Sequence, residues 1–168
     1  MINLAGELKN TKANGPDLRY TIFTQGCSHV PKCEGCHNDH TWSDKPNRLI
    51  SVDELYNRIM KEVPIIKGVT FSGGEPFDQA KDLFELAVKL KAAGLSVMCY
   101  TGYTYEELQQ LFCMRSMEFT YMKHLLCNID ILVDGAFDIN KTEKAGLYRG
   151  SSNQRMLYLN KGEIIRIE

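Results

Sequence analysis

The chain has 168 residues, enough to bury a substantial core, and we expect residues 1–168 to form one domain. Hydrophobic residues make up 43% and charged residues 24%, an ordinary composition that excludes a disordered chain. The net charge of −1, with Lys and Arg scattered among acids, argues against nucleic-acid binding. No basic start followed by an apolar core and no bilayer-length apolar run is seen, so we expect a cytoplasmic protein without a membrane partner.

Strands and helices are predicted to alternate along the chain. A turn at residues 14–17 precedes the first strand. Strands are expected at residues 19–24, 68–72, 95–100 and 128–134, where β-branched and aromatic residues cluster. Helices are expected from the capping box at 51–54 to about Pro64, over 80–90 with Gly94 as the stop, from the capping box at 104–107 to Phe112, and over 115–127.

This alternation predicts an α/β fold built from βαβ units with right-handed crossovers. A closed eight-unit barrel needs about 250 residues. We therefore expect a partial (β/α) barrel or an open, mainly parallel sheet. The tail differs, because residues 156–159 and 163–167 flank a turn at Asn160–Gly162, which predicts a C-terminal β-hairpin over about residues 155–168.

Three cysteines, Cys27, Cys33 and Cys36, lie in the loop after the first predicted strand. Three thiolates can hold an iron–sulfur cube and leave one iron open to a substrate or cofactor. The alternative is a structural zinc site completed by a nearby histidine: His29, His37 or His40. A disulfide is disfavoured, since nothing indicates export. The other cysteines are expected to pack as small hydrophobic side chains: Cys99, Cys113 and Cys127.

Three more glycine-containing loops follow predicted strands, at Gly73–Pro76, Tyr100–Tyr103 and Asp134–Gly135. In parallel α/β folds the carboxyl ends of the strands emerge on one side, where active sites are assembled. We therefore expect these loops and the cysteine loop to share one face. The double glycine lets backbone approach a ligand closely, although a plain turn would have the same sequence.

Eight strings along the chain resemble a known family. They are Asn14–Pro16, Gly26–Cys27, Gly35–Asn38, Thr41–Trp42, Phe71–Pro76, Tyr100–Tyr103, Leu132–Gly135 and Arg149–Arg155. Together they resemble the radical S-adenosylmethionine enzymes, and within these the activating proteins of anaerobic (class III) ribonucleotide reductases. One departure is the five residues between Cys27 and Cys33, where the family has three. Each doubling of a flexible loop costs only about 0.6 kcal/mol, so ligation by all three thiols is still expected.

The resemblance implies a 4Fe-4S cluster held by Cys27, Cys33 and Cys36, with S-adenosyl-L-methionine chelating the fourth iron. Reductive cleavage would release a 5′-deoxyadenosyl radical, which would create a glycyl radical on the anaerobic ribonucleoside-triphosphate reductase. A low-potential electron donor such as flavodoxin or ferredoxin is also implied. The alternatives are an activase of another glycyl-radical enzyme, of the pyruvate formate-lyase type, and a non-catalytic zinc-binding interaction module.

The same resemblance assigns contacts to the cofactor. The turn formed by Gly73, Gly74 and Glu75 is expected to receive the methionine amino group. The segment Gly35, Cys36 and His37 is expected near the adenine. Contacts to the ribose or to a nearby cation are expected from Tyr100, Thr101 and Asp134. The string Arg149–Arg155 is compatible with a docking surface, a phosphate contact or a polar turn.

Overall fold

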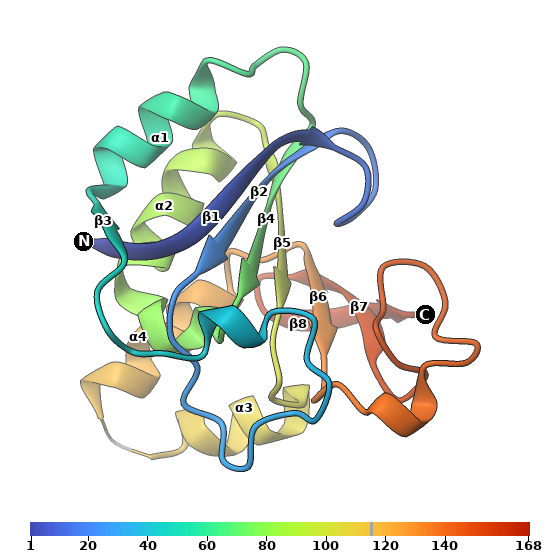
Figure 1. Cartoon of the computed structure of the whole chain (residues 1–168). Helices are drawn as coiled ribbons and strands as arrows, with labels where there is room; N and C mark the ends of the chain where they lie inside the picture. The colour runs from blue at the N-terminus through green and yellow to red at the C-terminus, as the bar shows by residue number, and fades with distance from the viewer. Residues whose placement is uncertain (115) are drawn as a thin grey trace.

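The computed structural model describes residues 1–114 and 116–168 and contains an open, eight-stranded mixed sheet (Figure 1). The strands are β1 Ile2–Thr11, β2 Arg19–Thr24, β3 Arg48–Ile50, β4 Gly68–Gly73, β5 Ser96–Tyr100, β6 Ile131–Asp134, β7 Arg155–Asn160 and β8 Glu163–Ile167. The helices are α1 Val52–Met60, α2 Ala80–Ala92, α3 Tyr105–Phe112 and α4 Met117–Leu126, with short 3-10 helices η1 Asp39–Thr41, η2 Pro76–Gln79 and η3 Ile139–Lys141. None of the described helices has the length and apolar character needed to cross a membrane.

The sheet has a parallel centre and antiparallel flanks, in the order β3-β1-β2-β4-β5-β6-β7-β8. Strands β2, β4, β5 and β6 run parallel, whereas β1 and β3 on one side and β7 and β8 on the other pair antiparallel. The expected α/β class and open sheet are confirmed. The expectation of a mainly parallel sheet holds only for the centre, because short connections such as the turn between β7 and β8 return the chain antiparallel.

Several element boundaries differ from the predictions. Strands β1 and β3 were not predicted, because β1 is buried only at its start and β3 has three residues. Helix α1 ends at Met60 rather than near Pro64, since the residue before a proline avoids helical angles. Strand β6 begins at Ile131, after a turn in which the Asp130 carboxylate accepts the Val97 N–H. The helix expected from Arg115 begins at Met117, and Arg115 lies outside the described residues.

The two faces of the sheet are covered differently. Alternate side chains of the central strands, including Ile22, Phe71 and Cys99, pack with the helices in the main core. Figure 1 shows α1, α2 and α4 grouped on one side of the sheet. The opposite face carries a smaller cluster of Met98, Ile131, Val133 and Met156, covered in part by Tyr148. The sheet thus keeps one face free of helices, where loops and polar side chains can form a site.

Arg19 ties the starts of the parallel strands together although it is only 1% exposed. Its guanidinium donates to Thr70 Oγ1, to the carbonyl oxygens of Pro16, Val69 and Ser96, and to the Ser96 hydroxyl. Burial lowers the pKa of Arg19 to about 10. The contacts of this side chain therefore span β2, β4 and β5.

The Arg19→Ala variant is expected to lose about 3 kcal/mol of unfolding free energy, because buried acceptors lose their donor and a cavity remains. Urea unfolding measures the loss. Lys61→Ala, at an exposed position, is the matched control and should change stability by less than about 0.5 kcal/mol. Equal stability of the Arg19→Ala and Lys61→Ala proteins would show that the buried hydrogen bonds contribute nothing.

Candidate functional site

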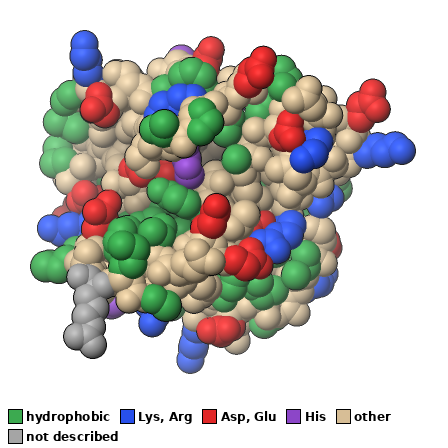
Figure 2. All heavy atoms as spheres, turned by 90° about the horizontal axis from the view of Figure 1, so that it is seen from below, with side chains coloured by type: hydrophobic (Ala, Val, Ile, Leu, Met, Phe, Trp, Pro, Cys, Tyr) green, Lys and Arg blue, Asp and Glu red, His purple; other side chains and the backbone are tan. Residues whose placement is uncertain are grey.

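A cavity of about 440 Å³ lies at the carboxyl ends of the central strands, where the strand-exit loops meet. This volume is typical of small-molecule sites, which measure about 300 to 1,000 Å³. Most of the predicted site residues line it: Cys27, Cys33, Cys36, His37, Gly73, Gly74, Glu75, Tyr100 and Thr101. Gly35 and Asp134 do not line it. Figure 2 views this end of the molecule and shows acidic side chains and a histidine beside a hollow bordered by hydrophobic groups.

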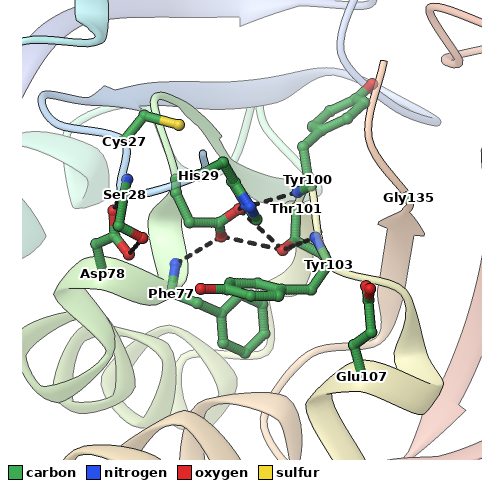
Figure 3. Close-up of polar contacts among 12 residues, drawn as sticks. Cys27, Ser28, His29, Phe77, Asp78, Tyr100, Thr101, Tyr103, Glu107 and Gly135 are labelled. Carbon is green, nitrogen blue, oxygen red and sulfur yellow. Dashed lines mark hydrogen bonds and ion pairs between the residues drawn. The ribbon is translucent and has the colours of Figure 1, made fainter. Parts of the chain in front are cut away.

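The first part of the cysteine loop is anchored by two carboxylates. The Ser28 N–H and hydroxyl both donate to Asp78, at 2.7 and 2.6 Å. His29 Nε2 lies 2.6 Å from Glu75 Oε2, and this contact raises the pKa of His29. Both acids follow the Gly73-Gly74 turn. Figure 3 shows these contacts grouped below Cys27, whose sulfur points away from Asp78.

The second part of the loop is ordered around Cys36. Its N–H donates to the Cys33 carbonyl, and the Asn38 N–H donates to its sulfur at 3.4 Å. The His37 ring packs on Phe137, with ring centroids 5.1 Å apart. Val30, between the two anchored ends, is 92% exposed. Val30 therefore projects into solvent, whereas Lys32 is half-buried and its Nζ donates back to the Cys27 carbonyl oxygen.

The three thiols are half-buried and all line the cavity, where they form a set of soft donors. Burial raises the pKa of Cys27 and of Cys33. Across the described part of the chain, no three His, Cys, Asp or Glu side chains converge as they would around a single ion. A cube of four irons is wider than one ion, so its ligands need not meet at a point. Soft thiolates spaced around a hollow fit such a cluster, with one coordination position left open.

Of the three other cysteines, only one is buried as predicted. Cys99 is buried in the core, which confirms its assignment as a packed thiol, and burial raises its pKa well above the ordinary value. Cys113 and Cys127 are exposed, so their prediction as packed side chains was wrong. Both occupy the C-cap positions of α3 and α4, where the chain leaves the helix and side chains reach solvent.

The Glu75 carboxylate is 1% exposed and has protein partners on both oxygens. It accepts the N–H groups of Phe77 and Gly102, at 3.0 and 2.9 Å, and the hydroxyl of Thr101. With His29 added, the carboxylate joins three loops. The Thr101 hydroxyl is thus already engaged with Glu75, and the Gly74 N–H donates to the Thr24 carbonyl oxygen at 2.9 Å. Gly73 and Gly74 both line the cavity, so their carbonyl groups are the candidates for a ligand contact.

The two glycines also allow the turn after β4 to pack closely against the backbone of Thr24 and Gly26. Gly73 has φ +107°, and a Cβ there would lie 2.3 Å from the Thr24 nitrogen. A Cβ on Gly74 would lie 1.8 Å from the Gly26 carbonyl oxygen. Glu75 N–H in turn donates to that same oxygen at 2.8 Å. Only glycine therefore lets the turn contact the residue that precedes Cys27.

Asp134, expected to contact the ribose or a nearby cation, has its carboxylate bound to protein groups beside the cavity. It is 1% exposed. Its carboxylate accepts the Tyr105 N–H at 2.7 Å and Arg155 Nε at 3.0 Å. Arg155 also pairs with Glu106, and the contact lowers the pKa of Glu106. Asp134 thus anchors the start of α3 to β7, and this use of its carboxylate was not apparent from the sequence.

The Arg155→Ala variant is expected to lower the unfolding free energy by about 2 kcal/mol, because it leaves the buried Asp134 carboxylate without its cation. This expected loss of unfolding free energy is smaller than the loss on breaking a fully buried ion pair, since the Arg155 side chain is 34% exposed. Arg166→Ala, at a 56% exposed side chain that pairs with Glu168 and lies over the Tyr158 ring, should cost about 1 kcal/mol or less. Thermal and urea unfolding measure the loss of stability in both variants. Equal losses would contradict the role of Arg155 as the cation that pairs with the buried Asp134.

The string Arg149–Arg155 contacts the loop after β6. Gln154 Nε2 donates to the Gly135 carbonyl, and Asn153 Nδ2 donates to the Ala136 carbonyl, both at 2.8 Å. These side chains are turned toward the protein and shape the loop that packs on the cysteine loop. Of the three interpretations left open by the sequence, the geometry favours the polar turn for these two residues.

Two contact residues, His29 and Phe137, were not predicted in these roles. The sequence marks His29 only as an imidazole near the thiols, so its carboxylate partner was not foreseeable. Phe137 lies far from the cysteine loop along the chain. No local sequence pattern links it to His37.

The site agrees with the comparisons to known proteins. The family described as 4Fe-4S single cluster domain matches residues 13–157. The chain is 33% identical over 150 residues to the anaerobic ribonucleoside-triphosphate reductase-activating protein of Enterobacteria phage T4, covering 85% of each chain. It is 30% identical over 153 residues to the protein of that name from Escherichia coli (strain K12), covering 87% of this chain and 92% of the relative.

A second kind of relative matches a shorter region. The pyruvate formate-lyase-activating enzyme of Staphylococcus epidermidis is 45% identical over 87 residues, which is 49% of this chain and 34% of that enzyme. The longer matches decide the assignment. The chain belongs to the 4Fe-4S single-cluster family and, within it, to the anaerobic ribonucleoside-triphosphate reductase-activating proteins. It is a glycyl-radical-activating enzyme of the radical S-adenosylmethionine class, and the iron–sulfur interpretation replaces the zinc alternative.

Proposed function

We propose that this chain cleaves S-adenosyl-L-methionine reductively and generates a glycyl radical on an anaerobic ribonucleotide reductase. The proposal is supported mainly by the cavity itself, which is lined by both the three thiols and the Gly73-Gly74 turn at the carboxyl ends of parallel strands. A 4Fe-4S cluster would supply the electron for cleavage to a 5′-deoxyadenosyl radical. The electron would come from a flavodoxin or ferredoxin.

The chain's own residues would hold and orient the reactants. Cys27, Cys33 and Cys36 would ligate the cluster. The backbone of Gly73 and Gly74 would receive the methionine amino group, because their carbonyls are approachable without a side chain in between. Cys36 and His37 would lie near the adenine, with Tyr100 as a further wall of the cavity. Glu75, Thr101 and Asp134 would act indirectly, through the loops that they fix.

The test is transfer of the radical to a protein substrate. The reconstituted chain, dithionite and S-adenosylmethionine are incubated anaerobically with an anaerobic ribonucleotide reductase, and the glycyl radical is recorded by electron paramagnetic resonance. We expect a signal that is absent when the reductase glycine is replaced by alanine. No signal from the reductase, with cleavage of S-adenosylmethionine intact, would contradict the assigned substrate.

A pyruvate formate-lyase is the second candidate substrate, favoured by the higher identity over 87 residues. The same incubation is repeated with this protein in place of the reductase. The coverage of the reductase-activating relatives, 85% and 92% of their lengths, favours the reductase. A radical on the lyase alone would reverse the assignment.

A further inference from the structure

The contact between His29 and Glu75 joins three of the loops that border the cavity. His29 belongs to the cysteine loop, Glu75 to the turn after β4, and Thr101 and Gly102, which also bind Glu75, to the loop after β5. The two side chains are 20% and 1% exposed, and their 2.6 Å contact is shielded from water. Hydrogen bonds to an ionised group are about twice as strong as neutral ones. Figure 3 shows His29 as one of the groups bonded to the Glu75 carboxylate, which is the common acceptor of this network.

The His29 ring is also held by packing on two sides. Its centroid lies 4.4 Å from that of the Tyr103 ring, in a tilted arrangement. A Cβ on Gly102 would lie 2.6 Å from Nε2, so the ring rests directly on the backbone of that glycine. The contacts with Tyr103 and Gly102, together with the bond from Nε2 to Glu75, restrict the position of the ring. A ring held in this way also restricts the backbone of the neighbouring residues in the cysteine loop.

We propose that His29 is a positioning residue, which fixes the Cys27 end of the cysteine loop against the Gly73–Glu75 turn and so sets where S-adenosylmethionine lies relative to the cluster. The inference rests on the proposed function. It explains how the five-residue spacing is accommodated. Ser28 and His29 anchor the start of the cysteine loop, and the additional residues between Cys27 and Cys33 come after them, beginning at the exposed Val30.

The first test needs no cofactor. Hydrogen exchange of the cluster-free protein is followed by mass spectrometry on a peptide that covers the cysteine loop. In His29→Ala, the amides of this loop are expected to exchange at least tenfold faster than in the wild type, while His29→Gln, whose amide can still donate to Glu75, restores most of the protection. His40→Ala, at a 66% exposed imidazole, is the matched control and should match the wild type. Unchanged exchange in His29→Ala would overturn the inference.

The second test uses the reconstituted enzyme. His29→Ala is expected to bind as much iron as the wild type but to raise the KM for S-adenosylmethionine at least tenfold, with a smaller change in kcat, and His29→Gln should recover most of the loss. Loss of iron in His29→Ala would instead make the residue a ligand and refute the positioning role. If His29→Ala does not fold, Tyr103→Leu, which removes the aromatic ring packed on His29 together with its hydroxyl group, must show the same effects in weaker form.

The two proposals fail in different ways. A wild-type protein that binds iron but does not cleave S-adenosylmethionine contradicts the proposed function, whereas the exchange experiment still decides whether His29 fixes the loop. A wild-type protein that cleaves it, beside a His29→Ala protein with unchanged exchange and unchanged KM, contradicts the inference alone.

Discussion

Replacing any one of Cys27, Cys33 and Cys36 by alanine is expected to abolish cluster assembly and cleavage of S-adenosylmethionine. The three thiols line the cavity together with two imidazoles, of which His29 has its Nε2 engaged with Glu75 and His37 has its ring packed on Phe137. Iron per chain should fall from about four to below about one, measured after anaerobic reconstitution. Product formation should fall to the background of the cluster-free protein.

The exposed cysteines supply the matched controls. Cys113→Ala and Cys127→Ala remove a thiol without touching the cavity, so iron content and cleavage should equal those of the wild type. Retained cleavage by Cys33→Ala would show that the ligand set is misassigned. Loss of iron on changing either exposed cysteine would show that the cluster lies elsewhere.

The Gly74→Ala variant is expected to lose at least about 100-fold in the rate of S-adenosylmethionine cleavage, since misplacement of reacting groups by about 1 Å has effects of this size. The added Cβ would lie 1.8 Å from the Gly26 carbonyl oxygen, so the backbone must move. Gly26 immediately precedes Cys27. The shift would therefore displace a cluster ligand and the turn expected to bind the methionine amino group at once.

Gly6→Ala is the matched control for this substitution. A Cβ on Gly6 would have its closest contact 3.9 Å away, at the Phe23 ring, and should fit without strain. Its cleavage rate should stay within about twofold of the wild type, consistent with the small effects of unstrained substitutions. A Gly74→Ala enzyme with the rate of Gly6→Ala would contradict the assigned geometry of the turn.

The central strands were predictable because their signal is local. Residues 19–24 and 68–72 contain β-branched and aromatic residues and are each followed by a loop that begins with glycine or polar residues. Both segments form buried parallel strands. The exit loops of parallel strands must share one edge, so the sequence also placed the thiols opposite the double glycine. The β1 strand lacked such a signal, because only its first residues are buried and its pairing with β2 and β3 is set by tertiary contacts.

The side-chain contacts within the site were not predictable in the same way. The family resemblance implied that Glu75 and Asp134 lie near a ligand, but both carboxylates are buried at 1% exposure and bind protein groups. Their partners, His29 for one and Arg155 for the other, lie 46 and 21 positions away along the chain. Such pairing depends on how the loops pack, and no period or spacing in the sequence encodes it.

The measurement that tests the central claim most directly is anaerobic reconstitution with iron and sulfide, followed by reduction with dithionite in the presence of S-adenosylmethionine and chromatography of the products. We expect about four irons per chain and formation of 5′-deoxyadenosine, since the three thiols hold a cluster with one open position. Binding of zinc in place of iron, with no 5′-deoxyadenosine, would contradict the account and leave the cysteine loop as a structural metal site.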